Sequence, residues 1–264
     1  MKIGLWRITP TACSAPVARE RRRLLIEPAR LSAETCSIAL LDSERHYLRR
    51  VLRLRIGDQV DVVNGQGDLW TVTLDAGGDR LLMAGDSNRP QRSRPRPTPL
   101  LGLAVALIRR DSDVWIRMAC ELGIDRIQPV VADRCVPQAE RREDRWQTIV
   151  HESVEQCERL WAPTLLPAVD MEAWLDGVDG RVAMAVTREE STPELSTWLV
   201  TDPSVSPTWL LVGPEGGWSQ EEHHWVETGR VQPVALGDNI LRSSTAAVRG
   251  AVEMVRWRES HCRA

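Results

Sequence analysis

The sequence contains no phenylalanine, one tyrosine and, apart from Lys2, no lysine. It also lacks any apolar run long enough to cross a membrane, which takes about 20 residues. The first residues have no sustained apolar segment of the kind that a secretory signal requires. We therefore expect a cytoplasmic protein with no membrane partner.

Metal-binding patterns are missing as well. The six cysteines include no Cys-x-x-Cys pair, and the five histidines include no pair at the spacing His-x-x-x-His. Structural zinc sites depend on such closely spaced ligands. The sequence therefore predicts no metal site, and its cysteines are expected to be reduced and structural.

The charge is divided unevenly along the 264 residues. Residues 1–100 contain 17 basic and 11 acidic side chains, a net charge of +6, and the remainder contains 17 and 26, a net charge of −9. A basic first part on an acidic body predicts an anionic partner that the first part holds. Arginine suits such contacts because its guanidinium group can form paired hydrogen bonds to phosphates and bases.

Changes in composition and periodicity predict four segments. They are a flexible extension over residues 1–18, a β-rich domain over 19–88, an Arg- and Pro-rich linker over 89–99 and an α/β domain over 100–264. The length and the 42% hydrophobic content are sufficient for two modest cores.

The β-rich domain combines short strands with one helix. Asn64-Gly65 is a strong hairpin signal between two alternating segments. The stretch 43–54 has apolar residues at helical spacing, with His46 and several arginines largely on the other side. These features predict a small β-barrel. The charge run Arg19–Arg23 before the first strand fits either a solvated face or a phosphate contact.

The second domain alternates strands and helices. Apolar runs at 100–108, 127–131 and 181–186 predict buried strands, and helical patterns at 142–160 and 245–259 lie between or after such runs. This alternation predicts a parallel sheet covered by helices. Ligands of such sheets bind beyond the carboxyl ends of the strands.

Two glycine turns lie where ligands of this kind of sheet bind. In the first, LLVGPEGGWSQEE, a strand meets three glycines and then a helix that begins at Ser219, with Glu222 three residues later as a capping box. The second runs from Leu236 to Ala246 and also leads into a helix. One such turn is an ordinary tight turn, but two in succession favour a ligand site. Neither matches a P-loop.

The two turns also carry a resemblance. LLVGPEGGWSQEE and ALGDNILRSSTAAV resemble the C-terminal signature of the RsmE family, HYLRRVLR is similar to its HLxxVLR motif, and the similarity covers roughly residues 21–258. The resemblance implies an α/β trefoil-knotted SPOUT methyltransferase domain preceded by a small PUA-like β-barrel domain. It also implies a homodimer that uses S-adenosyl-L-methionine to methylate N3 of a uridine in 16S rRNA of the small ribosomal subunit, which in the family is uridine 1498 of the decoding region.

The resemblance also assigns site residues. Arg242 would stabilise the uracil anion or hold the target phosphate, and Glu215 would act as general base or only cap the next turn. The expected cofactor-binding residues are Thr187, Leu211, Gly213, Gly216, Gly217, Leu236, Gly237, Ile240, Leu241, Thr245 and Ala246. The expected RNA-binding residues are Arg22, Arg23, His46, Arg49, Arg50 and Arg53.

One departure from the family pattern lies inside the second turn. Ser244 stands where the family usually has glutamate, so a carboxylate close to the site is missing. Two alternatives therefore stay open. The chain could methylate another RNA, or it could be an RNA-binding assembly factor without catalytic activity.

Overall fold

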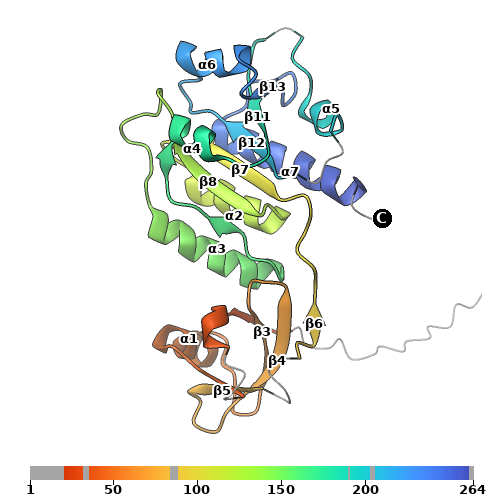
Figure 1. Ribbon diagram of the computed structural model, residues 1–264. Coiled ribbons are helices and arrows are strands. Elements are labelled where there is room, and N and C mark those ends of the chain that lie inside the picture. The colour runs from red at the N-terminus through yellow and green to blue at the C-terminus, as the bar shows by residue number, and fades with distance from the viewer. Residues whose placement is uncertain (1–20, 32–35, 84–88, 190, 203–205, 262–264) are drawn as a thin grey trace, which may run out of the picture.

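The computed structural model describes residues 21–31, 36–83, 89–189, 191–202 and 206–261. These residues form two sheets, which lie one above the other in Figure 1 and are joined by the chain between β6 and β7. The predicted extension 1–18 lies outside the described residues.

The first sheet has six strands in the order β1-β3-β4-β5-β2, with β6 paired to β4. The strands are β1 (Arg23–Leu25), β2 (Ser37–Ala39), β3 (Gln59–Val63), β4 (Asp68–Leu74), β5 (Arg80–Met83) and β6 (Arg92–Ser93). Its helical elements are η1 (Pro28–Arg30), α1 (Asp42–His46) and η2 (Tyr47–Val51), a single turn of π-helix. Strand β6 lies within the stretch predicted as a linker, so part of that stretch belongs to this sheet.

The predicted hairpin at Asn64-Gly65 is confirmed. The Asn64 side chain accepts hydrogen bonds from the backbone of Gln66 and Asp68, and Gly65 adopts a φ of 66°, which favours glycine. The strands on either side pair antiparallel, and Val62 of β3 and Val72 of β4 are fully buried. Burial does not alternate along β3, because its last four residues are all buried.

The second sheet is parallel throughout, as the strand-helix alternation predicts, and has the order β10-β8-β7-β12-β11-β13 with β9 paired to β8. The strands are β7 (Leu101–Ala106), β8 (Arg126–Val131), β9 (Thr164–Leu165), β10 (Val169–Asp170), β11 (Arg181–Ala185), β12 (Thr208–Val212) and β13 (Gln232–Val234). The helices are α2 (Ser112–Leu122), α3 (Glu143–Cys157), α4 (Met171–Gly177), α5 (Leu195–Leu199), α6 (Gln220–Glu227) and α7 (Ser243–His261).

Local signals determine several helix ends. Gly123, with a φ of 109°, ends α2, and the predicted capping box of Ser219 and Glu222 begins α6. The last helix begins at Ser243, two residues earlier than its apolar pattern indicated, because polar residues fill its first turn. No helix in the described part of the chain combines the length and apolar character needed to cross a membrane.

The two sheets meet at a junction built from backbone and side-chain contacts. Gly67 N donates to Leu160 O and Ala162 N donates to Gly65 O, both at 2.9 Å. Leu69 of the first sheet packs with Leu160 and Val154 in one small buried cluster. The hydrogen bonds and the packing together hold the two sheets in a fixed relation.

Replacing Gly67 with alanine should destabilise this junction. Gly67 has a φ of 104°, and a Cβ there would meet the Arg94 carbonyl oxygen and come within 2.8 Å of Trp161 Nε1. Backbone strain and overpacking together should cost about 3 kcal/mol of unfolding free energy in urea denaturation. Gly57→Ala is the matched control, because Gly57 has a φ of 86° but open space around it, so only the strain of about 1 kcal/mol should appear. If both variants lose the same unfolding free energy, the close contacts of Gly67 do not contribute to the loss.

Candidate functional site at the carboxyl edge of the second sheet

Three neighbouring strands end side by side at this edge. Strand β11 lies between β12 and β13, and all three run in the same direction. The segments that follow them therefore emerge together: 213–219 after β12, 186–188 after β11 and 235–242 after β13. Both predicted glycine turns and Thr187 thus lie at one edge of the sheet.

Trp218 fixes the turn after β12 to the neighbouring strand β11. Its indole nitrogen donates to Ala185 O at 2.8 Å, which ties the turn to the end of β11. A Cβ on Gly213 would come within 2.9 Å of the Trp218 ring, so this position must be glycine. Gly217 has a φ of 71° and open space around it, and its N–H donates to Pro214 O at 3.0 Å, so the turn is closed internally while a ligand could still approach it closely.

Residues after β8 support the same turn. One oxygen of the buried Glu222 carboxylate accepts from Ser219 N at 2.7 Å and the other from Asp133 N at 2.9 Å. Ser219 Oγ donates to Asp133 Oδ2 at 2.5 Å. The capping box predicted Glu222, but no local signal pointed to Asp133, because its partners are more than 80 positions away in the chain.

The turn after β13 exposes both backbone and side chains. Gly237 has a φ of 100° with no atom within 4 Å of an added Cβ, and Ile240 is 61% exposed although it is apolar. The Arg242 side chain is exposed and has no ion-pair partner among the described residues. Arg242 immediately precedes α7, whose N-terminus adds a positive partial charge at this point.

The predicted cofactor-binding residues differ in accessibility. Thr187, Gly216, Gly217, Gly237, Ile240 and Thr245 are exposed, Gly213, Leu236 and Leu241 are partly buried, and Leu211 and Ala246 are buried. Open glycine backbone beside partly buried leucines offers hydrogen-bonding groups next to an apolar surface. That combination suits a small-molecule ligand with both polar and apolar parts.

Glu215 takes part in a loop contact. Its Oε1 accepts a hydrogen bond from Arg109 N at 3.1 Å, which joins the turn after β12 to the segment after β7. Of the two roles predicted for Glu215, this geometry favours the structural one, since one carboxylate oxygen already has a backbone donor.

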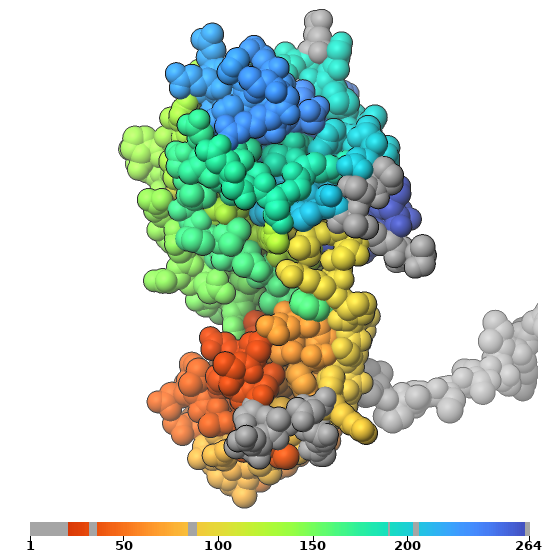
Figure 2. All heavy atoms as spheres, viewed as in Figure 1, coloured from red at the N-terminus to blue at the C-terminus, as the bar shows by residue number. Residues whose placement is uncertain are grey.

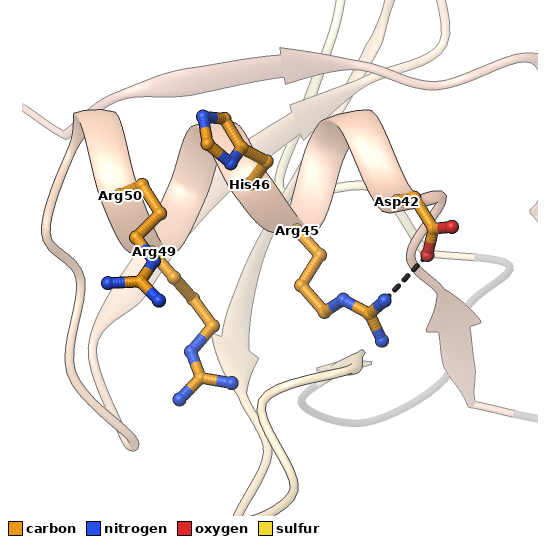
Figure 3. Close-up of a pocket in the computed structure, with 5 residues that line it drawn as sticks. All are labelled: Asp42, Arg45, His46, Arg49 and Arg50. Atoms are coloured by element: carbon orange, nitrogen blue, oxygen red, sulfur yellow. Dashed lines mark hydrogen bonds and ion pairs between the residues drawn. The ribbon is translucent and has the colours of Figure 1, made fainter.

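A basic pocket lies on the first domain. It has a volume of about 470 Å³ and is lined by Asp42, Arg45, His46, Arg49 and Arg50 from α1 and η2. In Figure 3 the guanidinium groups of Arg45, Arg49 and Arg50 extend to one side of the helix. Arg45 pairs with Asp42 at 2.6 Å, and Arg49 and Arg50 have no ion-pair partner among the residues that the structure describes. Three of the predicted RNA-binding residues are therefore brought together here.

The other predicted RNA-binding residues do not line this pocket. Arg22 and Arg53 are exposed, but neither lines the pocket. The expectation for Arg23 is corrected by the structure: its side chain is 7% exposed and its Nη2 lies 2.7 Å from Glu158 Oε2. Arg23 therefore joins the two domains instead of facing a ligand.

The cysteine and histidine side chains form no metal centre in the described part of the chain, where no group of three potential ligands comes together. Cys135 lies near the first glycine turn, and burial raises the pKa of its thiol. The thiol thus stays protonated near neutral pH.

Comparison with known proteins gives consistent matches over both domains. Residues 95–252 match the family described as RNA methyltransferase domain, and residues 40–82 match the one described as RNA methyltransferase PUA domain. Ribosomal RNA small subunit methyltransferase E of Synechocystis is 33% identical over 90% of this chain and 81% of its own length, and that of Rickettsia conorii is 32% identical over 87% and 93%.

A solved structure matches both domains together. Ribosomal RNA small subunit methyltransferase E from Neisseria gonorrhoeae, crystallised with S-adenosyl methionine, superposes with a TM-score of 0.73 and is 28% identical over 89% of this chain and 97% of that chain. The predicted fold class, a SPOUT α/β domain preceded by a PUA-like β-barrel, is confirmed.

Proposed function

Because the chain belongs to the RsmE family of ribosomal RNA small subunit methyltransferases, we propose that it methylates N3 of a uridine in 16S rRNA with S-adenosylmethionine as the methyl donor. The observation that carries the proposal is the pair of glycine turns at the ends of β12 and β13, with Arg242 in the second turn directly before α7. Arg242 is exposed and has no ion-pair partner among the described residues. The family target, uridine 1498, is part of the proposal.

The carboxyl edge of the second sheet fits the methyl donor. The exposed backbone of Gly237 offers hydrogen-bonding groups, and the exposed Ile240 offers an apolar surface to an adenine ring. When bound, S-adenosylmethionine supplies an electrophilic methyl group on a sulfonium centre. The turns would hold its adenosine part so that the acceptor nitrogen can approach in line, which makes the catalytic task mainly one of positioning.

Arg242 would supply the electrostatic part of catalysis. The N3–H of uracil is a weak acid, so the reactive form of the acceptor is an anion whose charge spreads onto the two carbonyl oxygens beside N3. An exposed guanidinium group beside a helix N-terminus can stabilise that charge through hydrogen bonds. The Glu215 carboxylate would keep the turn in shape through Arg109 N.

The basic pocket formed by Arg45, His46, Arg49 and Arg50 supports binding to the RNA backbone.

We include in the proposal a homodimer that acts on the small ribosomal subunit in the cytoplasm. Light scattering of the purified protein would test the dimer.

Unmethylated small ribosomal subunits should acquire 3-methyluridine when they are incubated with this protein and S-adenosylmethionine. The RNA would be digested and its nucleosides identified by mass spectrometry, with a reaction without the methyl donor as control. No methyluridine, despite calorimetric binding of S-adenosylmethionine, would favour either another RNA substrate or a non-catalytic assembly factor.

Ser244→Glu addresses the departure from the family pattern. Ser244 lies in the first turn of α7, where a carboxylate interacts favourably with the helix dipole, by about 0.3 to 1 kcal/mol. We expect the variant to be slightly more stable in urea and to methylate at least as fast as the natural protein. A slower variant would show that the serine is an adaptation of this chain.

A further inference from the structure

A row of arginines crosses the junction between the two domains. Arg92, Arg94 and Arg96 occur at every second position between β4 and β7, and prolines 95 and 97 directly follow the second and third of them. All three are exposed, and none has an ion-pair partner among the described residues. Their charges are therefore available to a partner molecule.

Local structure keeps these arginines in an extended row. The backbone of Arg92 pairs with Leu69 in the sheet, and Arg94 N donates to Gly67 O at 2.9 Å. A residue before proline is restricted to extended backbone, which applies to both Arg94 and Arg96. In extended backbone alternate side chains share one face, and two residues span about 6–7 Å.

The far end of the row is fixed by a tryptophan. The guanidinium carbon of Arg96 lies 5.6 Å from the centre of the Trp161 ring, and Trp161 Nε1 donates to Arg94 O at 2.9 Å. Trp161 follows α3 of the second domain, so the row ends on that domain. Figure 2 shows this segment, in yellow, running over the surface from the lower domain to the upper one.

The near end of the row opens into a polar groove. This groove has a volume of about 470 Å³, and its lining includes Arg21, Gln59, Asp61, Thr71, Gln91 and Arg92. The Asp61 carboxylate is already engaged, because it lies 3.2 Å from Arg21 Nε and accepts from Thr71 Oγ1 at 2.7 Å. The Asp61 carboxylate is therefore balanced by Arg21, and Arg92 is the lining arginine with no ion-pair partner among the described residues.

We propose that Arg92, Arg94 and Arg96, together with the groove beside Arg21, form a second RNA-binding surface that holds the sugar-phosphate backbone of one strand across the domain junction. It is separate from the basic pocket of α1 and η2, which is lined by none of these residues. Arginines repeated at about 6–7 Å along a fixed, extended backbone suit successive phosphates of an extended strand. The inference rests on the proposed function, which identifies the bound RNA as 16S rRNA.

The test compares RNA affinity as a function of salt for the full-length protein and 16S rRNA by filter binding. Replacing Arg92, Arg94 and Arg96 together with glutamine should weaken binding at least about tenfold at 0.1 M salt and reduce the slope of log affinity against log salt by about 2. Replacing all three with lysine should preserve the slope, since the charges remain. Calorimetric binding of S-adenosylmethionine should not change.

A matched control removes the same charge elsewhere. Arg117, Arg145 and Arg256 are exposed on α2, α3 and α7, and their joint replacement by glutamine should leave the salt slope unaltered. The proposal is overturned if the salt slope stays the same when Arg92, Arg94 and Arg96 are replaced by glutamine. It is also overturned if the control variant loses as much RNA affinity as that variant. Competition by poly-glutamate as strong as by RNA overturns it too and indicates an acidic protein partner. The assay measures RNA binding and not methyl transfer. It therefore tests this surface even if the protein shows no methylation activity.

Discussion

Arg242→Ala should lower the turnover number for methyl transfer by about 100- to 1,000-fold, which is the usual loss when one donor to a developing oxyanion is removed. The side chain is exposed and has no ion-pair partner among the described residues. Its removal should therefore leave the urea midpoint and the binding of S-adenosylmethionine unchanged. Turnover would be measured on unmethylated small subunits at saturating methyl donor.

Two further variants separate the possible roles of Arg242. Arg242→Lys keeps a point charge but loses the planar pair of donors, so it should recover only part of the rate. Arg256→Ala removes an exposed arginine from α7, the helix that Arg242 precedes, and serves as the control. A loss confined to KM for RNA would assign Arg242 to the target phosphate instead of the uracil anion. If Arg242→Ala changes neither the turnover number nor KM for RNA, both roles are wrong.

Features set by neighbouring residues could be predicted from the sequence. The hairpin at Asn64-Gly65, the end of α2 at Gly123 and the capping box at Ser219 each depend on residues within about four positions. The strand-helix alternation then required both glycine turns to lie at the carboxyl edge of one parallel sheet. The location of the candidate site follows from these local facts.

Contacts between distant residues could not be predicted in the same way. Arg23 reads as part of a basic run, but its partner Glu158 lies 135 positions away, and only the packing of α3 against β1 brings the two together. Asp133 likewise reaches Glu222 across 89 positions. Charge patterns show that a side chain needs a partner or water, but they do not show which of the two it finds.

Asp125 is the strongest case of such a hidden contact. It is 5% exposed, accepts from Leu101 N at 2.9 Å and forms an ion pair with Arg258 of α7, while Arg159 Nη2 lies 3.6 Å away. Arg258 also donates to Gly123 O at 2.8 Å. One carboxylate thus connects the start of β7, the segment after α2 and the last turns of α7.

Asp125→Ala should therefore cost about 4 kcal/mol of unfolding free energy, because it leaves a buried arginine and a buried backbone donor without their partner. Asp179→Ala is the control, since the Asp179 side chain is 57% exposed in its pair with Arg126 and should contribute less than about 1 kcal/mol. Both would be measured by urea denaturation at neutral pH. Losses of similar size would show that burial adds nothing to the Asp125 contact.

The same carboxylate should also affect the site at the other end of α7. Arg258 lies near the C-terminal end of this helix, and Arg242 immediately precedes its N-terminal end, so a helix released at one end should hold Arg242 less firmly at the other. A double-mutant cycle of Asp125→Ala and Arg258→Ala should show that the double variant loses clearly less stability than the two single losses combined. Methyl transfer would also be measured in Asp125→Ala under conditions where the variant remains folded. A normal rate would show that loss of the Asp125 contact lowers the free energy of unfolding without displacing Arg242. The glycine turns would then position Arg242 without help from Asp125.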